Sequence, residues 1–191
     1  HTISSMTGTP LSQRTAQLDN AERKQLEAVV AEMRERVEAN VRFQLTQFGL
    51  DTQPSDDATL DTETRQLVET IELEAVDGAD WDDALTAFVD GVGYTIVNRL
   101  AALRCMEVRG FLDEEVTVFK ETGLTPAAET LVHEEFLLED EAILAAYHNT
   151  CDELATEIEI LFDRSSAYSL LDPDEDTFED LCGMLDEVPD A

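Results

Sequence analysis

The sequence has little positive charge. Of its 191 residues, 44 are Asp or Glu and 12 are Lys or Arg, which gives a formal net charge of −32. Only Lys24 and Lys120 are lysines. Long blocks of like charge often indicate disorder. Here the acids are interleaved with leucine, valine and isoleucine at helical spacing, so we expect a folded domain with an acidic surface.

An acidic surface of this kind is typical of halophilic proteins. At molar salt the Debye length falls to about 3 Å, so repulsion among surface carboxylates is strongly screened. The scarcity of lysine agrees with this interpretation. A nucleic-acid mimic is the alternative, because dense carboxylates can imitate the spacing of phosphates. The acids are spread through the whole chain, which favours the halophilic interpretation.

Long apolar runs and paired cysteines are also missing. No segment approaches the roughly 18 apolar residues that span a bilayer, and the first residues contain no signal-peptide core. We therefore expect no membrane contact and a cytoplasmic location. The three cysteines are widely spaced without a CxxC motif, which predicts reduced thiols: Cys105, Cys151 and Cys182.

Residue patterns that carry catalysis are weak or absent. His133 and Glu134 do not form an HExxH motif. His148 and Cys151 could share a helix face, but two ligands seldom make a metal site. Ser165 lies far in sequence from the later histidines, and the chain has no glycine-rich phosphate loop. The residues alone therefore predict no catalytic, cofactor-binding or metal site.

Helical periodicity is the strongest signal that is present. It predicts an all-α fold, mostly a helical bundle, and a chain of this length forms one domain. The expected domain covers residues 19–188, after a lead-in at 1–18 that is flexible or partly an added remnant. The pattern also allows one short extended segment at Val116–Phe119, where the residues have β-branched character. The expected helices cover residues 20–48, 61–76, 80–110, 125–163 as two helices broken near Glu139–Glu141, and 178–185.

The segment from Gly91 to Gly110 is the expected centre of the bundle, since no acidic residue falls between Gly91 and Met106. At 100° per residue its apolar side chains form two stripes on nearly opposite sides, which predicts a helix that is buried on both sides. The first stripe is Leu85, Phe88, Val92, Ile96, Leu100 and Leu103. The second is Tyr94, Val97, Ala101, Cys105, Val108 and Leu112.

Three charged residues interrupt these stripes. Arg99 and Glu107 project near the first stripe, and Arg104 lies between the two. Because unpaired buried charges are costly, we expect them to meet carboxylates or backbone acceptors from neighbouring helices and to fix the helix register. The alternative is a docking surface for another domain or for a phosphate backbone.

The same segment resembles a known family. The pattern Tyr94–x3–Asn98-Arg99-Leu100-x-Ala102-Leu103-Arg104-x-Met106-Glu107-x2-Gly110-Phe111-Leu112 is similar to a region near the N-terminus of large adenine-specific DNA methyltransferases. These are the modification enzymes of BREX-type phage-exclusion systems and related restriction–modification proteins. The acidic helices on either side also look like the helical region before the catalytic domain. The resemblance makes Tyr94, Asn98, Arg99, Arg104 and Glu107 structural or interface candidates.

The resemblance implies a parent enzyme that uses S-adenosylmethionine, but this chain lacks the catalytic parts. Adenine methylation needs a flipped base held by an Asn/Asp-Pro-Pro-Tyr/Phe loop, and no two of the five prolines are adjacent. The cofactor usually binds a strand, a glycine-rich turn and a helix. Gly91-x-Gly93 lies inside a helical pattern instead. We therefore expect both sites in a methyltransferase domain that follows this chain.

The resulting hypothesis is a non-catalytic N-terminal domain of such an enzyme, from a halophilic archaeon. It would brace the catalytic domain of the same parent chain and dock other phage-defence proteins. DNA would be bound only by the parent enzyme and not by this domain alone. The alternative is an independent acidic interaction protein, such as a scaffold or a DNA mimic.

Overall fold

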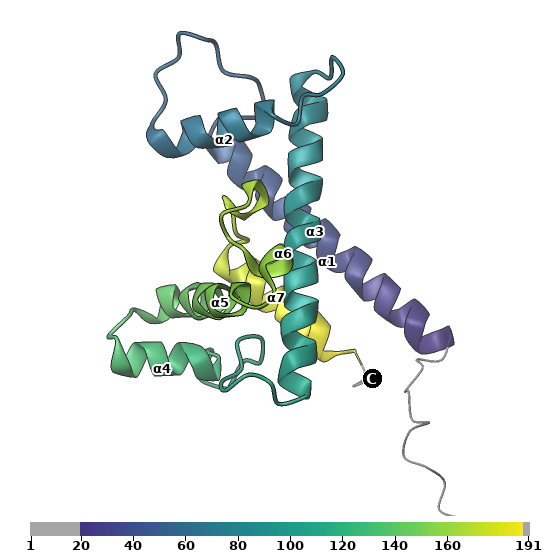
Figure 1. Cartoon of the computed structure of the whole chain (residues 1–191), viewed down its shortest axis with the longest axis vertical. Coiled ribbons are helices and arrows are strands. Elements are labelled where there is room, and N and C mark those ends of the chain that lie inside the picture. Colours follow the sequence, from purple (N-terminus) through teal and green to yellow (C-terminus); the bar gives the residue numbers. More distant parts are fainter. Residues whose placement is uncertain (1–19, 189–191) are drawn as a thin grey trace, which may run out of the picture.

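A computed structural model describes residues 20–188 of the chain, and in that range it contains helices and no strands (Figure 1). The predicted all-α fold is therefore confirmed. The elements are α1 (Asn20–Gln47), α2 (Thr62–Glu72), α3 (Trp81–Val108), α4 (Pro126–Glu134), α5 (Glu139–Ala155), α6 (Glu159–Phe162), the 3₁₀ turn η2 (Ala167–Ser169) and α7 (Glu175–Asp186).

Helix α3 is the centre of the fold. It contacts α1, α2, α6, η2 and α7, and α1 crosses it obliquely in Figure 1. Asp80 caps its first turn, with the carboxylate accepting a hydrogen bond from the amide of Asp83 at 2.9 Å. Trp81 fixes the helix entry by donating from Nε1 to the carbonyl of Leu50 at 2.9 Å. The whole first apolar stripe of α3 is buried, as predicted.

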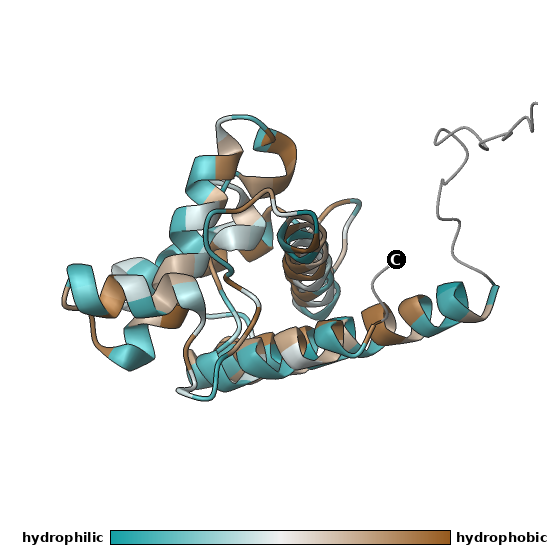
Figure 2. Ribbon diagram, turned by 90° about the horizontal axis from the view of Figure 1, so that it is seen from below, coloured by the Kyte–Doolittle hydropathy of each residue, from teal (hydrophilic) through white to brown (hydrophobic). Residues whose placement is uncertain are grey.

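The fully buried residues of helix α1 begin at Met33, after Val29 and Val30, which are partly buried against the core. Met33, Val37, Val41 and Leu45 are buried, whereas no residue of 20–32 is. Figure 2 shows this first part of α1 projecting beyond the other helices. The predicted lead-in at 1–18 and residue 19, where the predicted domain begins, lie outside the described residues.

The segment from 125 to 163 contains three helices, so the prediction of two was wrong. Thr125 caps α4 as expected, with its hydroxyl accepting from the amide of Ala128 at 3.2 Å. The first break comes before Glu139, at a turn where Phe136 adopts a left-handed conformation (φ 57°). A second break at 156–158 separates the short α6 from α5. Helical periodicity continues through both turns, which is why the sequence pattern did not reveal them.

Val116–Phe119 lies in the loop between α3 and α4 and pairs with no strand among residues 20–188. Val116 and Thr117 are buried all the same. Their amides donate to the side chain of Glu107. A carboxylate on α3 thus satisfies two buried backbone amides that have no strand to pair with.

Gly91 allows a close approach between α3 and η2. A Cβ atom at this position would lie 2.2 Å from the ring of Tyr168, so a larger residue would push the ring away. The Tyr168 hydroxyl donates to Glu74 at 2.6 Å. This bond, together with burial, raises the pKa of Tyr168 to about 12. The glycine therefore serves packing here, which is consistent with the helical position expected for Gly91-x-Gly93.

None of the helices in the described range is long and apolar enough to cross a membrane.

Candidate functional site around helix α3

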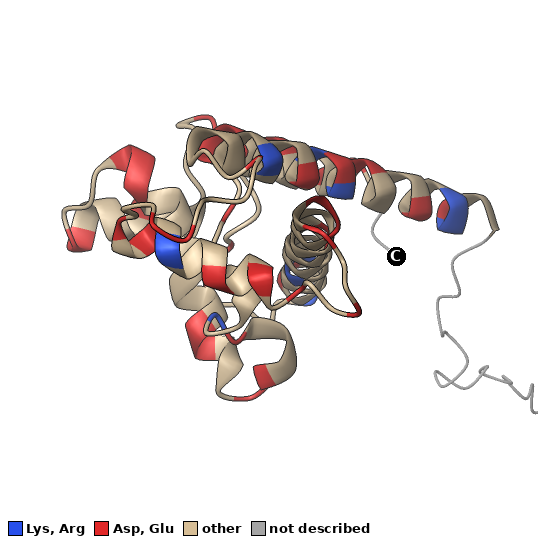
Figure 3. Cartoon of the chain, turned by 90° about the horizontal axis from the view of Figure 1, so that it is seen from above, with Lys and Arg blue, Asp and Glu red and all other residues tan. Residues whose placement is uncertain are grey.

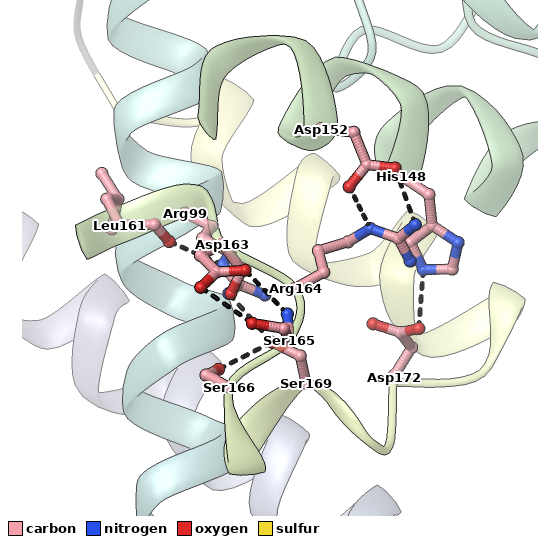
Figure 4. Close-up of polar contacts among 10 residues, drawn as sticks. All are labelled: Arg99, His148, Asp152, Leu161, Asp163, Arg164, Ser165, Ser166, Ser169 and Asp172. Carbon is pink, nitrogen blue, oxygen red and sulfur yellow. Dashed lines mark hydrogen bonds and ion pairs between the residues drawn. The ribbon is translucent and has the colours of Figure 1, made fainter. Parts of the chain in front are cut away.

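Arg99 is the largest fully buried side chain, with 2% of its surface exposed. Its Nε donates to the carbonyl of Leu161 at 2.8 Å, and its Nη2 donates to the carbonyl of Asp163 at 2.9 Å and to the Ser169 hydroxyl at 2.9 Å. Figure 4 shows the guanidinium pointing from α3 into the loop that follows α6. The expectation of backbone acceptors is confirmed, since Leu161 lies in α6 and Asp163 follows directly after it. No carboxylate of the described residues binds Arg99.

A buried tyrosine and thiol lie close to Arg99. Tyr147 is fully buried on α5, and its hydroxyl, like Nη1 of Arg99, has no hydrogen-bond partner within the described residues. Burial raises the pKa of Tyr147 well above its usual value. Burial likewise raises the pKa of the Cys151 thiol to about 11. Both groups are therefore protonated at neutral pH, and Cys151 is not activated as a nucleophile.

The outer part of this region is an ion-pair network between α5 and the loop after α6 (Figure 4). Arg164 binds both carboxylate oxygens of Asp152 at 2.8 Å, and this bidentate bond lowers the pKa of Asp152. Beside it, Nε2 of His148 lies 2.7 Å from Asp172. Bidentate arginine–carboxylate pairs fix geometry well. The network therefore ties the loop after α6 to α5, while Arg99 ties the start of the same loop to α3.

The network does not form a recognisable catalytic triad. The polar partner of His148 is Asp172. Ser165 bonds to Asp163, and Ser166 bonds to Ser169. No serine bonds to a histidine in the part of the chain that is described, and nucleophilic catalysis needs such a contact. His148 and Cys151 are not joined by a third ligand either, since residues 20–188 contain no metal-binding group of three or more His, Cys, Asp or Glu.

Glu107 is the second buried charge on α3. Its Oε1 accepts from the amides of Val116 at 2.9 Å and Thr117 at 3.0 Å, and its Oε2 accepts from the Thr117 hydroxyl at 2.5 Å. Arg104 lies 3.8 Å from Glu107 and donates to Asp186 on α7 at 2.9 Å. The three charged residues that interrupt the stripes therefore all have protein partners, as predicted, although those of Glu107 lie in the loop after α3 and not on a neighbouring helix.

The expectation that α3 is buried on both sides was wrong. Of the second stripe only Val97 is fully buried; Tyr94 is 60% exposed, Val108 is 46% exposed and Cys105 is exposed. The neighbouring helices pack on the first stripe, and the guanidinium of Arg34, 5.9 Å from the ring centre of Tyr94, covers part of one end. We call Tyr94, Asn98, Ala101, Cys105 and Val108 the outer face of α3.

The outer face carries no acidic residue, whereas acids occur on all the α-helices of the described range, α3 included. Figure 3 shows these acids in red. The side chain of Asn98 lies half-buried in the outer face and forms no hydrogen bond with any described residue. Figure 2 shows α3 end on, with apolar residues along its length. Uncharged, partly exposed helix faces are typical of interaction sites. The residues that the resemblance singled out thus divide into two sets, with Arg99, Arg104 and Glu107 paired inside the fold and Tyr94 and Asn98 facing out.

Sequence reasoning missed the partners of Arg99 and the network around Arg164. Leu161 and Ser169 lie 62 and 70 residues from Arg99 along the chain, and backbone carbonyls leave no residue-specific signal. The Arg164 network offered one weak clue, an isolated arginine in an acidic stretch. Its partner Asp152 could not be chosen among the many nearby acids.

The fold and its polar contacts define an all-α domain that is organised around a central helix with two buried, hydrogen-bonded charges and an uncharged outer face. Comparisons with protein-family models, curated proteins and solved structures found no match to the chain.

Proposed function

We propose that this chain is the non-catalytic helical N-terminal domain of an adenine-specific DNA methyltransferase of a phage-defence system, and that the outer face of α3 docks the catalytic domain. The observation that supports the docking role is the exposure of Tyr94, Cys105 and Val108 on a helix face without acids. The methyltransferase itself rests on the sequence resemblance, which includes two outward residues, Tyr94 and Asn98. S-adenosylmethionine and DNA would bind the parent enzyme outside this domain.

The gene provides the first test of the parent enzyme. We expect the reading frame to continue beyond the codon for Ala191 into a domain with an Asn/Asp-Pro-Pro-Tyr/Phe loop. A stop codon directly after Ala191 would contradict the proposal and favour the alternative, an independent acidic interaction protein. The downstream sequence also supplies the catalytic domain needed for the binding test.

Charge on the outer face should prevent docking. We expect Tyr94→Glu and Cys105→Glu each to weaken binding to the separately produced catalytic domain by about tenfold or more, because an unpaired carboxylate would be desolvated at the interface. Isothermal titration calorimetry measures the effect. Val76→Glu is the matched control, since Val76 is 64% exposed on the loop after α2. Equal binding of all three variants, each with a wild-type melting temperature, would refute docking through this face.

We also propose that the acidic surface is an adaptation to high salt. Carboxylates repel one another even where helices pack together. At the contact between α1 and α3, desolvation and the nearby carboxylate of Asp90 raise the pKa of Glu38. Salt shortens the range of such repulsion from about 30 Å at 0.01 M to about 3 Å at 1 M. The melting temperature followed by circular dichroism should therefore rise with KCl. A melting temperature that stays constant on dialysis into dilute buffer would contradict this proposal.

A further inference from the structure

The second half of α5, the facing side of α4 and residues 111–114 line an open groove of about 750 Å³. Its lining includes the apolar side chains of Leu112, Leu131 and Leu154. Phe111 stands at the groove with 72% of its surface exposed. An exposed phenylalanine beside partly covered leucines is the kind of surface that partner side chains bury.

The rim of this groove is negatively charged and lacks neutralising cations. Five carboxylates line it, Asp113, Glu114, Glu135, Glu153 and Glu157, together with no Lys, Arg or His. Glu114 accepts from the Thr130 hydroxyl at 2.6 Å. The other four side chains form no ion pair and receive no hydrogen bond from residues 20–188.

A second groove on the molecule shows that this arrangement is not general. The groove between α1, α7 and the loop at 117–119 is also lined by acids, but it contains Arg36, which pairs with Asp180 at 3.1 Å. Its Asp186 pairs with Arg104. Internal cations balance part of the charge there. At the groove between α4 and α5, balancing cations must come from outside.

We propose that the groove between α4 and α5 binds a basic amphipathic helix of a partner protein. Leucine-like side chains at helical spacing would cover Phe111 and Leu154, and Lys or Arg on the flanks would meet Glu135, Glu153 and Glu157. Nucleic acid is excluded as the occupant because its phosphates would face five carboxylates. A second copy of this chain is disfavoured by its net charge of −32. The inference goes beyond the proposed function and does not depend on docking through the outer face of α3.

The probe is a fluorescent synthetic helix of about 18 residues, or five turns, with leucines on one face and lysines on the other. Because any cationic peptide is attracted to this chain, two comparisons are needed. One is a peptide with the same composition in scrambled order. The other is a pair of triple variants with equal charge changes: Glu135→Gln, Glu153→Gln and Glu157→Gln in the groove, and Glu63→Gln, Glu69→Gln and Glu121→Gln elsewhere on the exposed surface.

We expect fluorescence anisotropy to show about tenfold weaker binding for the groove triple variant and for Phe111→Ala, whereas the control triple variant changes affinity by about twofold or less. The amphipathic peptide should bind more tightly than the scrambled one, and the amides of Asn149 and Thr150 should shift in NMR spectra. Equal affinity of both peptides, or equal weakening by both triple variants, would overturn the proposal. Tyr94→Glu should leave this binding unchanged, which separates failure here from failure of docking through α3.

Discussion

Replacing Arg99 by alanine is expected to lower the free energy of unfolding by on the order of 3–5 kcal/mol. The substitution removes three hydrogen bonds of 2.8–2.9 Å at a position with 2% exposure. It leaves the carbonyls of Leu161 and Asp163 without their donors and opens a cavity beside α3. At about 2–4 °C for each kcal/mol in a domain of this size, the melting temperature should fall by roughly 6–20 °C.

Arg36→Ala is the control for this prediction. Arg36 also forms an arginine–carboxylate contact, at 3.1 Å to Asp180, but both side chains are at least half exposed. Its removal should cost about 0.5 kcal/mol or less. Hydrogen exchange adds a local measurement, because the amides of the α6–η2 loop should lose protection in Arg99→Ala. An unchanged melting curve would show that Arg99 is held in place without stabilising the fold.

The position of Arg99 illustrates how much of this fold the sequence predicts. Its burial follows from the helical wheel, since residue 99 lies beside the stripe that contains Ile96, Leu100 and Leu103, and the structure confirms it. The need for hydrogen-bond acceptors follows from the cost of an unpaired buried charge. The acceptors themselves do not follow, because any backbone carbonyl can fill that role. Helical periodicity predicts which side chains are buried, but it does not predict which backbone carbonyls they contact.

The outer face of α3 is a case in which the sequence pattern gave a wrong prediction of burial. Apolar side chains on both sides of one helix predicted burial on both sides, yet Tyr94 and Val108 are exposed. Periodicity reports which side chains are apolar, and it cannot tell a face covered within the domain from a face that a partner covers. In the same way, the acids at 139–141 suggested a helix break, whereas the chain turns just before them and uses them in the first turn of α5. Acids in a first turn are favourable because the helix dipole is positive there.

Replacing Glu107 by alanine is the second change with a large expected effect, again on the order of 3–5 kcal/mol. Glu107 is 8% exposed and accepts hydrogen bonds from two buried amides and one hydroxyl of Val116 and Thr117. Alanine would leave these three donors unpaired in the interior. Because these donors attach the loop between α3 and α4 to the side of α3, the loop should lose this attachment before the helices melt.

Glu107→Gln separates the loss of these bonds from the loss of charge. The amide oxygen of glutamine can still accept from both backbone amides, and its NH₂ group can donate to the Thr117 hydroxyl, so we expect a cost of about 1 kcal/mol. Thermal unfolding compares the two variants, and hydrogen exchange at Val116 and Thr117 locates the change. If alanine and glutamine destabilised the domain equally, the negative charge itself would be the stabilising element, through Arg104 at 3.8 Å. If neither did, the buried carboxylate would be dispensable for folding. Since Arg104 also binds Asp186 and is partly exposed, the hydrogen bonds to the loop are expected to dominate.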